Sequence, residues 1–300
     1  MDKILITGAV GQIGRFLVRK LLKQGKIFSG LDVRKPINLP DFDLFDIQVT
    51  NKENFQKLRS RLDEFSILIH LASKIDIESD VLKSGIPSVD LNISGTLKLL
   101  EFLPNLEHIC YASTYMVYGT PTKTPITEFH PTEPTTVYGA SKLATEKFLQ
   151  IFSSQRKVGV SILRLMGVYD LERPHEQAIP SFIKLMSNNQ SPKIFGNGNV
   201  RRNHVHVDDV IESILKSIKV KKSGVFNIGG SNSPSNIELV NLINKNLGKS
   251  IKPIIKETKE KQYDFITDIS RAEKILGFVP KIGIEEGIKR TVERFKEDEW

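Results

Sequence analysis

The 300-residue chain has only one cysteine, Cys110, and no long apolar segment. A single thiol excludes an intrachain disulfide and a cysteine-only metal site, and it favours a reducing, cytoplasmic location. The best apolar run, Phe65–Ala72, contains Ser66 and His70 and is far shorter than the ~18 residues of a membrane span. Lys3–Thr7 leads directly into a glycine motif without a cleavage site, so we expect neither a signal peptide nor a membrane segment.

Acidic residues are fewer than basic ones: 35 Asp and Glu stand against 43 Lys and Arg, which gives a net charge of +8. A basic balance can indicate nucleic acid, an anionic membrane or acidic small molecules. The densest lysine groups, at 216–222 and 249–261, are interleaved with Ile, Val and Glu, and no aromatic-basic array accompanies them. We therefore expect no nucleic-acid partner. A nucleic-acid binder is the weakest alternative, and it predicts strongly salt-dependent binding of oligonucleotides.

Strand and helix signals alternate through the first half of the chain. The composition, 39% hydrophobic and 26% charged, is that of a globular enzyme. Alternating short apolar runs and apolar-periodic segments predict an α/β fold, a doubly wound parallel sheet with helices on both faces. The expected strands are 3–7, 27–32, 43–47, 66–71, 108–113 and 158–165, and the expected helices are 12–24, 50–63, 87–103 and 136–153.

The sequence changes character after Leu165. Pro, Asn and Gly cluster at 173–174, 187–192 and 196–199, and short elements replace the regular alternation. We therefore predict a first domain at residues 1–165 and a smaller C-terminal lobe formed mainly by residues 166–300. The segment 204–230 has a strand–helix–strand pattern, and we expect it to return to the first sheet.

Three glycines follow the first expected strand at a spacing of three residues, in the run TGAVGQIG at positions 7–14. Gly8 permits a tight turn, Gly11 allows a pyrophosphate to approach the backbone, and Gly14 allows close packing of helix on sheet. The helix that opens with Gln12 and Ile13 presents N–H groups to the phosphates. The motif predicts a dinucleotide site at these five residues, although glycine loops also serve as plain turns.

Asp32 ends the second expected strand, 18 residues beyond Gly14. An acid at this place accepts hydrogen bonds from the adenosine ribose and repels a 2′-phosphate, so it predicts NAD rather than NADP as the cofactor. Arg34, two residues further on, weakens that preference. The alternative role for Asp32 is to cap a helix or loop.

Tyr138 and Lys142 lie four residues apart on an expected helix, and therefore on one face of it. A free tyrosine has a pKa of about 10. The Lys142 ammonium and a nicotinamide cation are expected to lower the Tyr138 pKa by about three units, which requires roughly 4 kcal/mol. Tyr138 would then exchange a proton with a substrate hydroxyl during hydride transfer, while Lys142 also bonds the nicotinamide ribose. Such a pair is also common on solvated helix faces.

Thr114 directly follows the expected strand 108–113 and has Ser113 beside it. Parallel sheets place functional groups at the carboxyl ends of their strands. The Thr114 hydroxyl is therefore a candidate to hydrogen-bond the reacting oxygen of a substrate. The alternative is a hydroxyl that satisfies the backbone at the end of the strand.

Together these motifs resemble the extended short-chain dehydrogenase/reductase family, in its NAD-dependent epimerase/dehydratase branch, over nearly the whole chain. The resemblance implies a Rossmann-type sheet and activity on nucleotide-diphosphate sugars. The further markers that carry it, in chain order, are Asp46-Ile47, His70-Leu71-Ala72, Asn92, Ser113–Gly119, Leu163-Arg164, Arg202 before His206–Asp209, Phe226–Gly229 and Leu276–Pro280.

The resemblance also implies roles for individual residues. Thr114, Tyr138 and Lys142 carry over as the catalytic triad, and Arg202 becomes a candidate ligand for the substrate phosphates. A homodimer would form by pairing the helices at 87–103 and 136–153. The further cofactor residues that it implies are Asp46 and Ile47 at the adenine, Leu71 and Ala72 along the cofactor, and Asn92.

Departures from the family pattern narrow the reaction. Related dehydratases have an Asp-Glu pair directly after the catalytic threonine, whereas this chain has Tyr115-Met116, and the glutamate usual in related decarboxylases is also missing. Gly167 stands where many nucleotide-sugar enzymes have an asparagine near the pyrophosphate. We predict a 4-epimerase that uses NAD and acts on a UDP-sugar through a transient 4-keto intermediate. The alternatives are an NAD(P)-dependent nucleotide-sugar 4-ketoreductase or dehydrogenase and a non-catalytic dinucleotide-sensing regulator.

His204 and His206 alternate on an expected strand and precede Asp208 and Asp209. No third clustered ligand with a familiar spacing accompanies them, so we predict no metal site. Asp208 is expected to cap the helix that follows.

Overall fold

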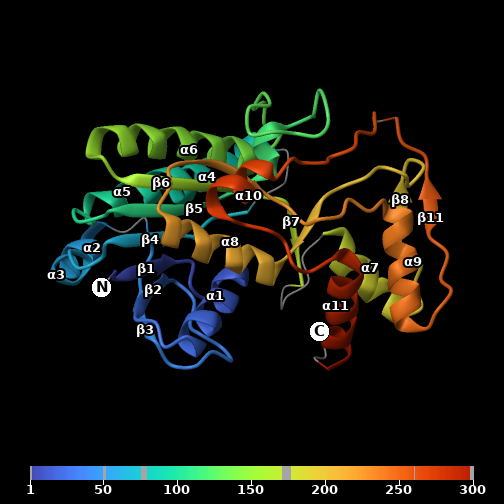
Figure 1. Cartoon of the computed structure of the whole chain (residues 1–300), viewed down its shortest axis with the longest axis horizontal. Coiled ribbons are helices and arrows are strands. Elements are labelled where there is room, and N and C mark those ends of the chain that lie inside the picture. The colour runs from blue at the N-terminus through green and yellow to red at the C-terminus, as the bar shows by residue number, and fades with distance from the viewer. Residues whose placement is uncertain (1, 50–51, 76–79, 171–176, 260, 298–300) are drawn as a thin grey trace.

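The computed structural model describes residues 2–49, 52–75, 80–170, 177–259 and 261–297, and its centre is a sheet of seven parallel strands (Figure 1). The order β3-β2-β1-β4-β5-β6-β10 reverses direction between β1 and β4, which is the doubly wound arrangement predicted from the sequence. Ligands of such sheets bind at the carboxyl ends of the strands beside this reversal. The strands are β1 (Ile4–Thr7), β2 (Phe28–Asp32), β3 (Asp43–Asp46), β4 (Ile67–His70), β5 (His108–Thr114), β6 (Gly159–Leu165) and β10 (Gly224–Ile228).

Helices cover both faces of this sheet, so that β1, β4 and β5 are buried at every position. This burial explains why these strands are continuous apolar runs rather than alternating ones. One face carries α1 (Gln12–Lys23), α8 (Val207–Val220) and α10 (Ser270–Leu276). The other carries α2 (Lys52–Lys57), the short α3 (Arg59–Leu62), α5 (Thr96–Glu101) and α6 (Val137–Arg156).

The helical segment between β4 and β5 begins before Pro87, where the sequence predicted its start. α4 (Val81–Ser88) starts after Asp80, whose carboxylate accepts a hydrogen bond from the Leu82 amide at 3.0 Å, and Pro87 lies inside the helix. The prediction that Pro87 stands in the first turn was therefore wrong, because a side-chain cap upstream nucleates the helix. Wider π-helical turns at Val89–Gly95 connect α4 to α5.

The C-terminal part of the chain forms a second core on the right of Figure 1. α7 (Ala178–Ser187), α9 (Asn236–Leu247) and α11 (Ile284–Glu297) pack together around Phe182, Leu239 and Ile288. Two small parallel sheets accompany them. They pair β8 (Lys193–Phe195) with β11 (Ile254–Lys256), and β7 (Gly167–Tyr169) with β9 (His204–His206).

The segment 204–230 divides between the two parts. β10 joins the edge of the large sheet beside β6, but β9 pairs with β7, so the expectation that the strand at 204 returns to the first sheet is wrong. The His206 ring packs edge-on against Tyr169 of β7, while Val168 and Val205 of the same two strands belong to the apolar core of the large sheet. His206 rather than Asp208 caps α8, because its Nδ1 accepts the Asp208 amide at 3.1 Å. That residues 1–165 bind the cofactor and residues 166–300 mainly the substrate stays a prediction.

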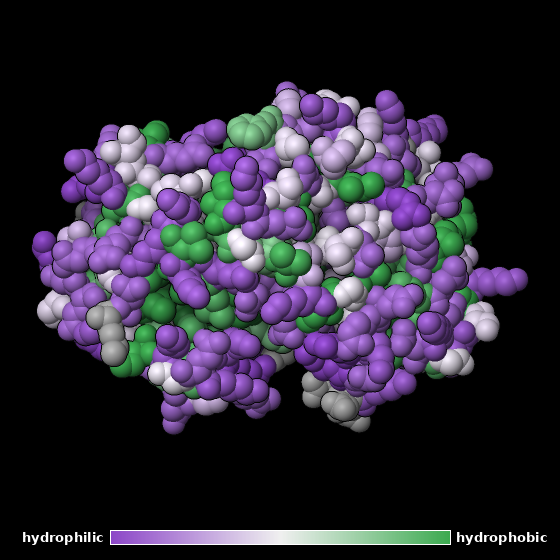
Figure 2. Space-filling view, viewed as in Figure 1, coloured by the Kyte–Doolittle hydropathy of each residue, from purple (hydrophilic) through white to green (hydrophobic). Residues whose placement is uncertain are grey.

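The surface in Figure 2 is mostly hydrophilic, with apolar side chains scattered between charged ones. None of the helices in the described ranges is long and apolar enough to span a membrane.

Candidate functional site

The glycine turn after β1 is packed too closely for side chains at all three glycines, and a Cβ on Gly11 would lie 2.9 Å from the Gly8 carbonyl oxygen. Gly8 has a φ of +69°, and a Cβ there would lie 2.7 Å from the Ala72 amide nitrogen. A Cβ on Gly14 would lie 2.1 Å from the Gly8 carbonyl oxygen. Gly11 precedes α1 and offers no capping side chain, so the first turn of the helix presents its N–H groups outward.

Asp32 lies at the carboxyl end of β2 with its carboxylate nearly buried. It accepts a hydrogen bond from the Val10 amide at 2.9 Å and another from the Arg34 amide at 3.0 Å. The Arg34 guanidinium donates to both carboxylate oxygens at 3.0 Å, and its Nη2 would lie 3.2 Å from a Cβ on Gly11. A cation therefore lies between the glycine turn and the buried acid.

The other cofactor candidates line the same end of the sheet. Asp46 is the register partner of Asp32 across β2 and β3, and Ile47 follows it. The Leu71 and Ala72 amides donate to the carbonyl and hydroxyl oxygens of Thr7, at 3.1 and 3.2 Å. A glycine turn without room for Cβ atoms, an open helix N-terminus and a buried acid one strand away fit a dinucleotide.

Asn92 uses all the hydrogen-bonding capacity of its side chain within the protein. Its amide nitrogen donates to the Lys74 carbonyl at 3.1 Å and to the Ser141 hydroxyl at 2.8 Å, and its oxygen accepts from Lys74 and Ser73. The side chain thus joins the segment after β4 to α6. This geometry favours a positioning role over the direct cofactor contact that the resemblance implied.

The start of α6 is held against the end of β5. Thr136 caps the helix by accepting the Gly139 amide at 3.0 Å, and a Cβ on Gly139 would lie 2.6 Å from the Met116 carbonyl oxygen. The Thr114 hydroxyl in turn accepts the Met116 amide at 3.3 Å. The 3-10 turn at Tyr115–Tyr118 therefore brings the strand end that carries Thr114 to the first turn of α6, where Tyr138 lies.

Burial is the main influence on the pKa of the Tyr138 phenol. It raises the Tyr138 pKa to about 12, against a hydrogen bond with Ser73 that opposes the shift. The Ser73 hydroxyl donates to Asn92 at 3.2 Å, which fixes it beside the phenol. The predicted lowering of the Tyr138 pKa is therefore not found in the free protein, because the phenolate would be desolvated and the Lys142 ammonium is held elsewhere.

Lys142 is fully buried one turn further along α6. Its ammonium nitrogen lies 4.1 Å from the centroid of the Tyr111 ring. Burial lowers the Lys142 pKa to about 7, and the carboxylate of Glu146 opposes that shift. Lys142 can therefore gain or lose a proton near neutral pH, a property typical of functional sites.

A buried ion pair connects α6 to the central sheet. Glu146 and Arg164 lie 2.7 Å apart with side chains 0% and 4% exposed, and the Ser113 hydroxyl donates to Glu146. The Arg164 guanidinium stacks over the Tyr118 ring. This pair ties α6 to the ends of β5 and β6.

Arg202 faces the same end of the sheet from the second part of the chain. Burial raises the pKa of Tyr115, and the charge of Arg202 nearby opposes the shift. The Tyr115 ring packs edge-on against Phe265 at 5.0 Å between centroids. The charge of an ionised Tyr115 in turn raises the Tyr138 pKa. Tyr115 therefore lies near enough to both Arg202 and Tyr138 for their charges to interact.

Residues 4–229 match the model of the NAD dependent epimerase/dehydratase family. The chain belongs to this family. A Methanocaldococcus jannaschii protein provisionally named UDP-glucose 4-epimerase is 32% identical over 98% of each chain. The structure of Thermotoga maritima UDP-glucose 4-epimerase with UDP-glucose is 28% identical, with a TM-score of 0.87 over 98% of this chain and 99% of that one. Bacillus cereus UDP-glucuronic acid 4-epimerase, solved with UDP-glucuronic acid and NAD, is 26% identical, with the same TM-score and coverage.

Membership of the epimerase/dehydratase family confirms the predicted family, the Rossmann-type fold, the enzyme class and the dependence on NAD. The individual site residues stay predictions, which the geometry above places at one end of the sheet.

Sequence reasoning missed several residues of this epimerase/dehydratase site. Ser73 follows a marker of the family, and its hydroxyl was a usable signal. Glu146 lies one turn beyond Lys142, so helical periodicity alone could have placed it beside the lysine. Phe265 gave no signal, because it reaches Tyr115 only through folding of the distant C-terminal part.

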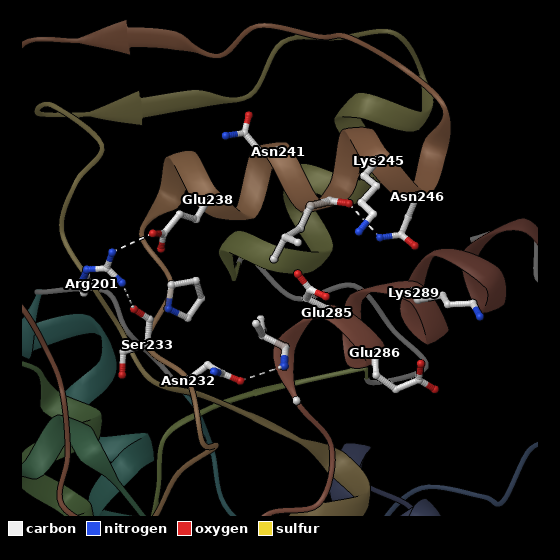
Figure 3. A pocket seen from close by; sticks show the side chains of 14 residues that line it. Arg201, Asn232, Ser233, Glu238, Asn241, Lys245, Asn246, Glu285, Glu286 and Lys289 are labelled. Atoms are coloured by element: carbon white, nitrogen blue, oxygen red, sulfur yellow. Dashed lines mark hydrogen bonds and ion pairs between the residues drawn. The ribbon is translucent and has the colours of Figure 1, made fainter.

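A separate cavity of about 1010 Å³ opens between α9 and the start of α11 (Figure 3). Most of the residues that line it are polar, and Arg201 pairs there with Glu238 at 2.7 Å. Arg202, the next residue, forms a backbone β-bridge with Phe265, and its charge acts on Tyr115 rather than on this cavity. The cavity includes no member of the predicted triad.

The two histidines of β9 do not form a metal cluster. Among the residues described by the structure, no group of three His, Cys, Asp or Glu side chains could hold a metal ion. The His206 Nε2 lies 2.8 Å from a carboxylate oxygen of Asp170, which also pairs with Arg294 at 3.0 Å. This buried group ties β9 to α11.

Proposed function

We propose that the chain is an NAD-dependent epimerase that inverts C4 of a UDP-sugar through a transient 4-keto intermediate. The observation that carries this proposal is the placement of Tyr138 and Lys142, one turn apart and buried on α6, beside the end of β5 that carries Thr114. Related enzymes of known structure were solved with UDP-sugars, and Arg202 offers a cation for a diphosphate at the same end of the sheet.

Each member of the triad has a separate task. The Tyr138 phenol exchanges a proton with the C4 hydroxyl, and the Thr114 hydroxyl holds the same oxygen. Only the Tyr138 phenolate can accept the C4 hydroxyl proton, so its pKa of about 12 in the free protein has to fall when a nicotinamide cation binds and the Lys142 ammonium turns from the Tyr111 ring towards the phenol. NAD, held along Gly8, Gly11 and Asp32, supplies the hydride acceptor and donor when bound.

Two observations bear on the competing reactions. Elimination of water needs an acid and a base beside the sugar, and Tyr115-Met116 offers no carboxyl group after Thr114. The ion pair between Arg34 and Asp32 neutralises the acid that would repel a 2′-phosphate, and this favours an NADP-dependent 4-ketoreductase as the second candidate.

Turnover assays distinguish these candidates. The purified protein is incubated with UDP-galactose, UDP-N-acetylgalactosamine and UDP-galacturonic acid without added NAD. Conversion of any of them to its C4 epimer supports the proposal, whereas net consumption of NAD(P)H with a 4-keto sugar supports the reductase. Tyr138→Phe should lower kcat about 10²–10⁴-fold and leave the bound NAD in place, and an unchanged kcat would remove Tyr138 from the mechanism.

We further propose that two copies pair through α4 and α6. These helices pack side by side, and both present apolar side chains to solvent, with Leu82 90% and Ile86 73% exposed on α4 and Phe148 and Ile151 exposed on α6. A patch of this kind is typical of an interface. The cytoplasmic location stays a prediction from the cysteine content.

A further inference from the structure

His204 differs from the other described histidines in its partners. His70, His108, His130 and His206 each have a hydrogen-bond or ion-pair partner for the ring. No group of the described residues hydrogen-bonds the His204 imidazole, whose only ring contact there is the edge of Tyr169. A neutral imidazole that no protein group engages keeps its N–H available for a ligand.

The location of His204 points to the substrate. Its register partner across β7 and β9 is Gly167, which follows β6 by two residues. β6 ends at Leu165, the register partner of Thr114. The imidazole therefore lies close to the strand ends where the predicted triad meets.

Gly167 keeps space for this ring. A Cβ on Gly167 would lie 3.0 Å from the His204 Nδ1, which is closer than side chains normally approach. Any larger residue at 167 would therefore press against the imidazole. The Gly167 backbone and the His204 ring are therefore in close contact.

Arg202 gives the site its charge. It lies two residues before His204 on an extended stretch, so the two side chains point to the same side. Burial and the Arg202 charge lower the His204 pKa to about 4, so the ring is neutral at physiological pH. A neutral imidazole has one N–H donor, which suits a phosphate oxygen already paired with a guanidinium.

We propose that the His204 imidazole donates a hydrogen bond to the diphosphate of the nucleotide sugar beside Arg202, in the space that Gly167 leaves open. This assignment rests on the proposed function, since it takes the diphosphate of that substrate as the ligand.

Calorimetry of the NAD-loaded protein with UDP, and with uridine, which lacks both phosphates, tests the assignment. His204→Ala should weaken UDP binding about tenfold and leave uridine binding and the melting temperature unchanged, as expected for one lost hydrogen bond to a charged group. His204→Asn returns an N–H donor and should recover most of the affinity. In turnover, His204→Ala should raise KM and leave kcat nearly unchanged.

Gly167→Ala provides an independent test, because its Cβ displaces the ring without removing it. It should weaken UDP binding in the same direction. Gly283→Ala is the matched control, since a Cβ there meets only the Asn232 side chain at 3.6 Å, and it should bind UDP as the parent protein does.

The outcomes separate this inference from the proposed function. If the parent protein binds UDP and His204→Ala binds it equally well, the inference is wrong and the proposed function stands. Equal losses of UDP and uridine binding would show a structural role for His204 and also overturn the inference. If the parent protein binds no UDP, the proposed function fails, and the inference fails with it.

Discussion

At Tyr138 and Lys142, burial acts against both charged forms. It raises the pKa of the phenol to about 12 and lowers that of the ammonium to about 7. The two side chains are therefore mostly neutral above pH 7 in the free protein, and their ionised forms become favourable only when another charge enters the site. The tyrosine–lysine spacing in the sequence placed these residues one turn apart on a helix, which the structure confirms, but not the direction of the Tyr138 pKa shift, because burial cannot be read from their spacing.

We expect Arg34 to influence the preference between NAD and NADP. Its guanidinium holds both oxygens of the Asp32 carboxylate, so removing it leaves an acid that repels a 2′-phosphate. Arg34→Ala should raise the Kd for NADP relative to the Kd for NAD at least about tenfold.

Fluorescence titration with NADH and NADPH measures this ratio. Lys35→Ala removes the neighbouring exposed cation and is the control for a general loss of positive charge. If Arg34→Ala leaves the ratio of the two Kd values unchanged, or if Lys35→Ala changes it equally, Arg34 does not recognise the 2′-phosphate.

At the scale of elements, α6 depends on the buried pair of Glu146 and Arg164. Replacing one partner leaves the other charge buried and unpaired, which costs about 3–5 kcal/mol. We expect Glu146→Leu to lower the free energy of unfolding by about this amount and the double variant Glu146→Leu, Arg164→Met to lose less.

Urea unfolding of the two single variants and the double variant measures the coupling. A double variant that loses the sum of both single losses would mean that the pair does not act as a unit.

The apolar faces of α4 and α6 should hold the dimer together. Leu82→Glu combined with Ile86→Glu places charges in the proposed interface, so the protein should elute as a monomer in size-exclusion chromatography with light scattering. Ile37→Glu alters a comparably exposed apolar residue outside these helices and should leave the dimer intact. A monomeric parent protein, or a dimer that survives both charges, would contradict the interface.

The alternation of strands and helices in the large sheet followed from local patterns, because apolar runs such as Ile4–Ile6 and Ile67–Ile69 mark its buried strands. The start of α4 and the pairing of β9 did not follow. The sequence predicted a helix from residue 87 because proline is typical of a first helical turn, whereas Asp80 caps α4 upstream. β9 is three residues long, too short to show which sheet it joins. Its partner is decided by contacts with Tyr169 that only the folded chain makes.

At the scale of the whole molecule, buried histidines make stability sensitive to acid. Burial lowers the pKa of His70 to about 3 and those of His108 and His204 to about 4. In the unfolded chain these rings titrate near their usual pKa of about 6.5. Between about pH 6.5 and 4 the unfolded state therefore binds protons that the folded state does not, and stability falls as the pH falls.

Each histidine contributes a slope of up to about 1.4 kcal/mol per pH unit, which the raised pKa of Glu128 partly offsets. Urea unfolding at pH 7.5, 6 and 5 should show this fall, and His108→Gln should reduce its slope by about one histidine's share. A stability that stays constant down to pH 5 would show that these rings are protonated in the folded protein.

Isotope tracing in deuterated water tests most directly whether the enzyme returns to C4 the same hydride that it removed from the sugar. The parent protein is supplied with a protonated UDP-sugar, and the C4 position of the epimer is examined by NMR. The account predicts inversion at C4 with no solvent deuterium on that carbon. Deuterium at C4 of the inverted sugar, or no inversion of any UDP-sugar, would contradict it.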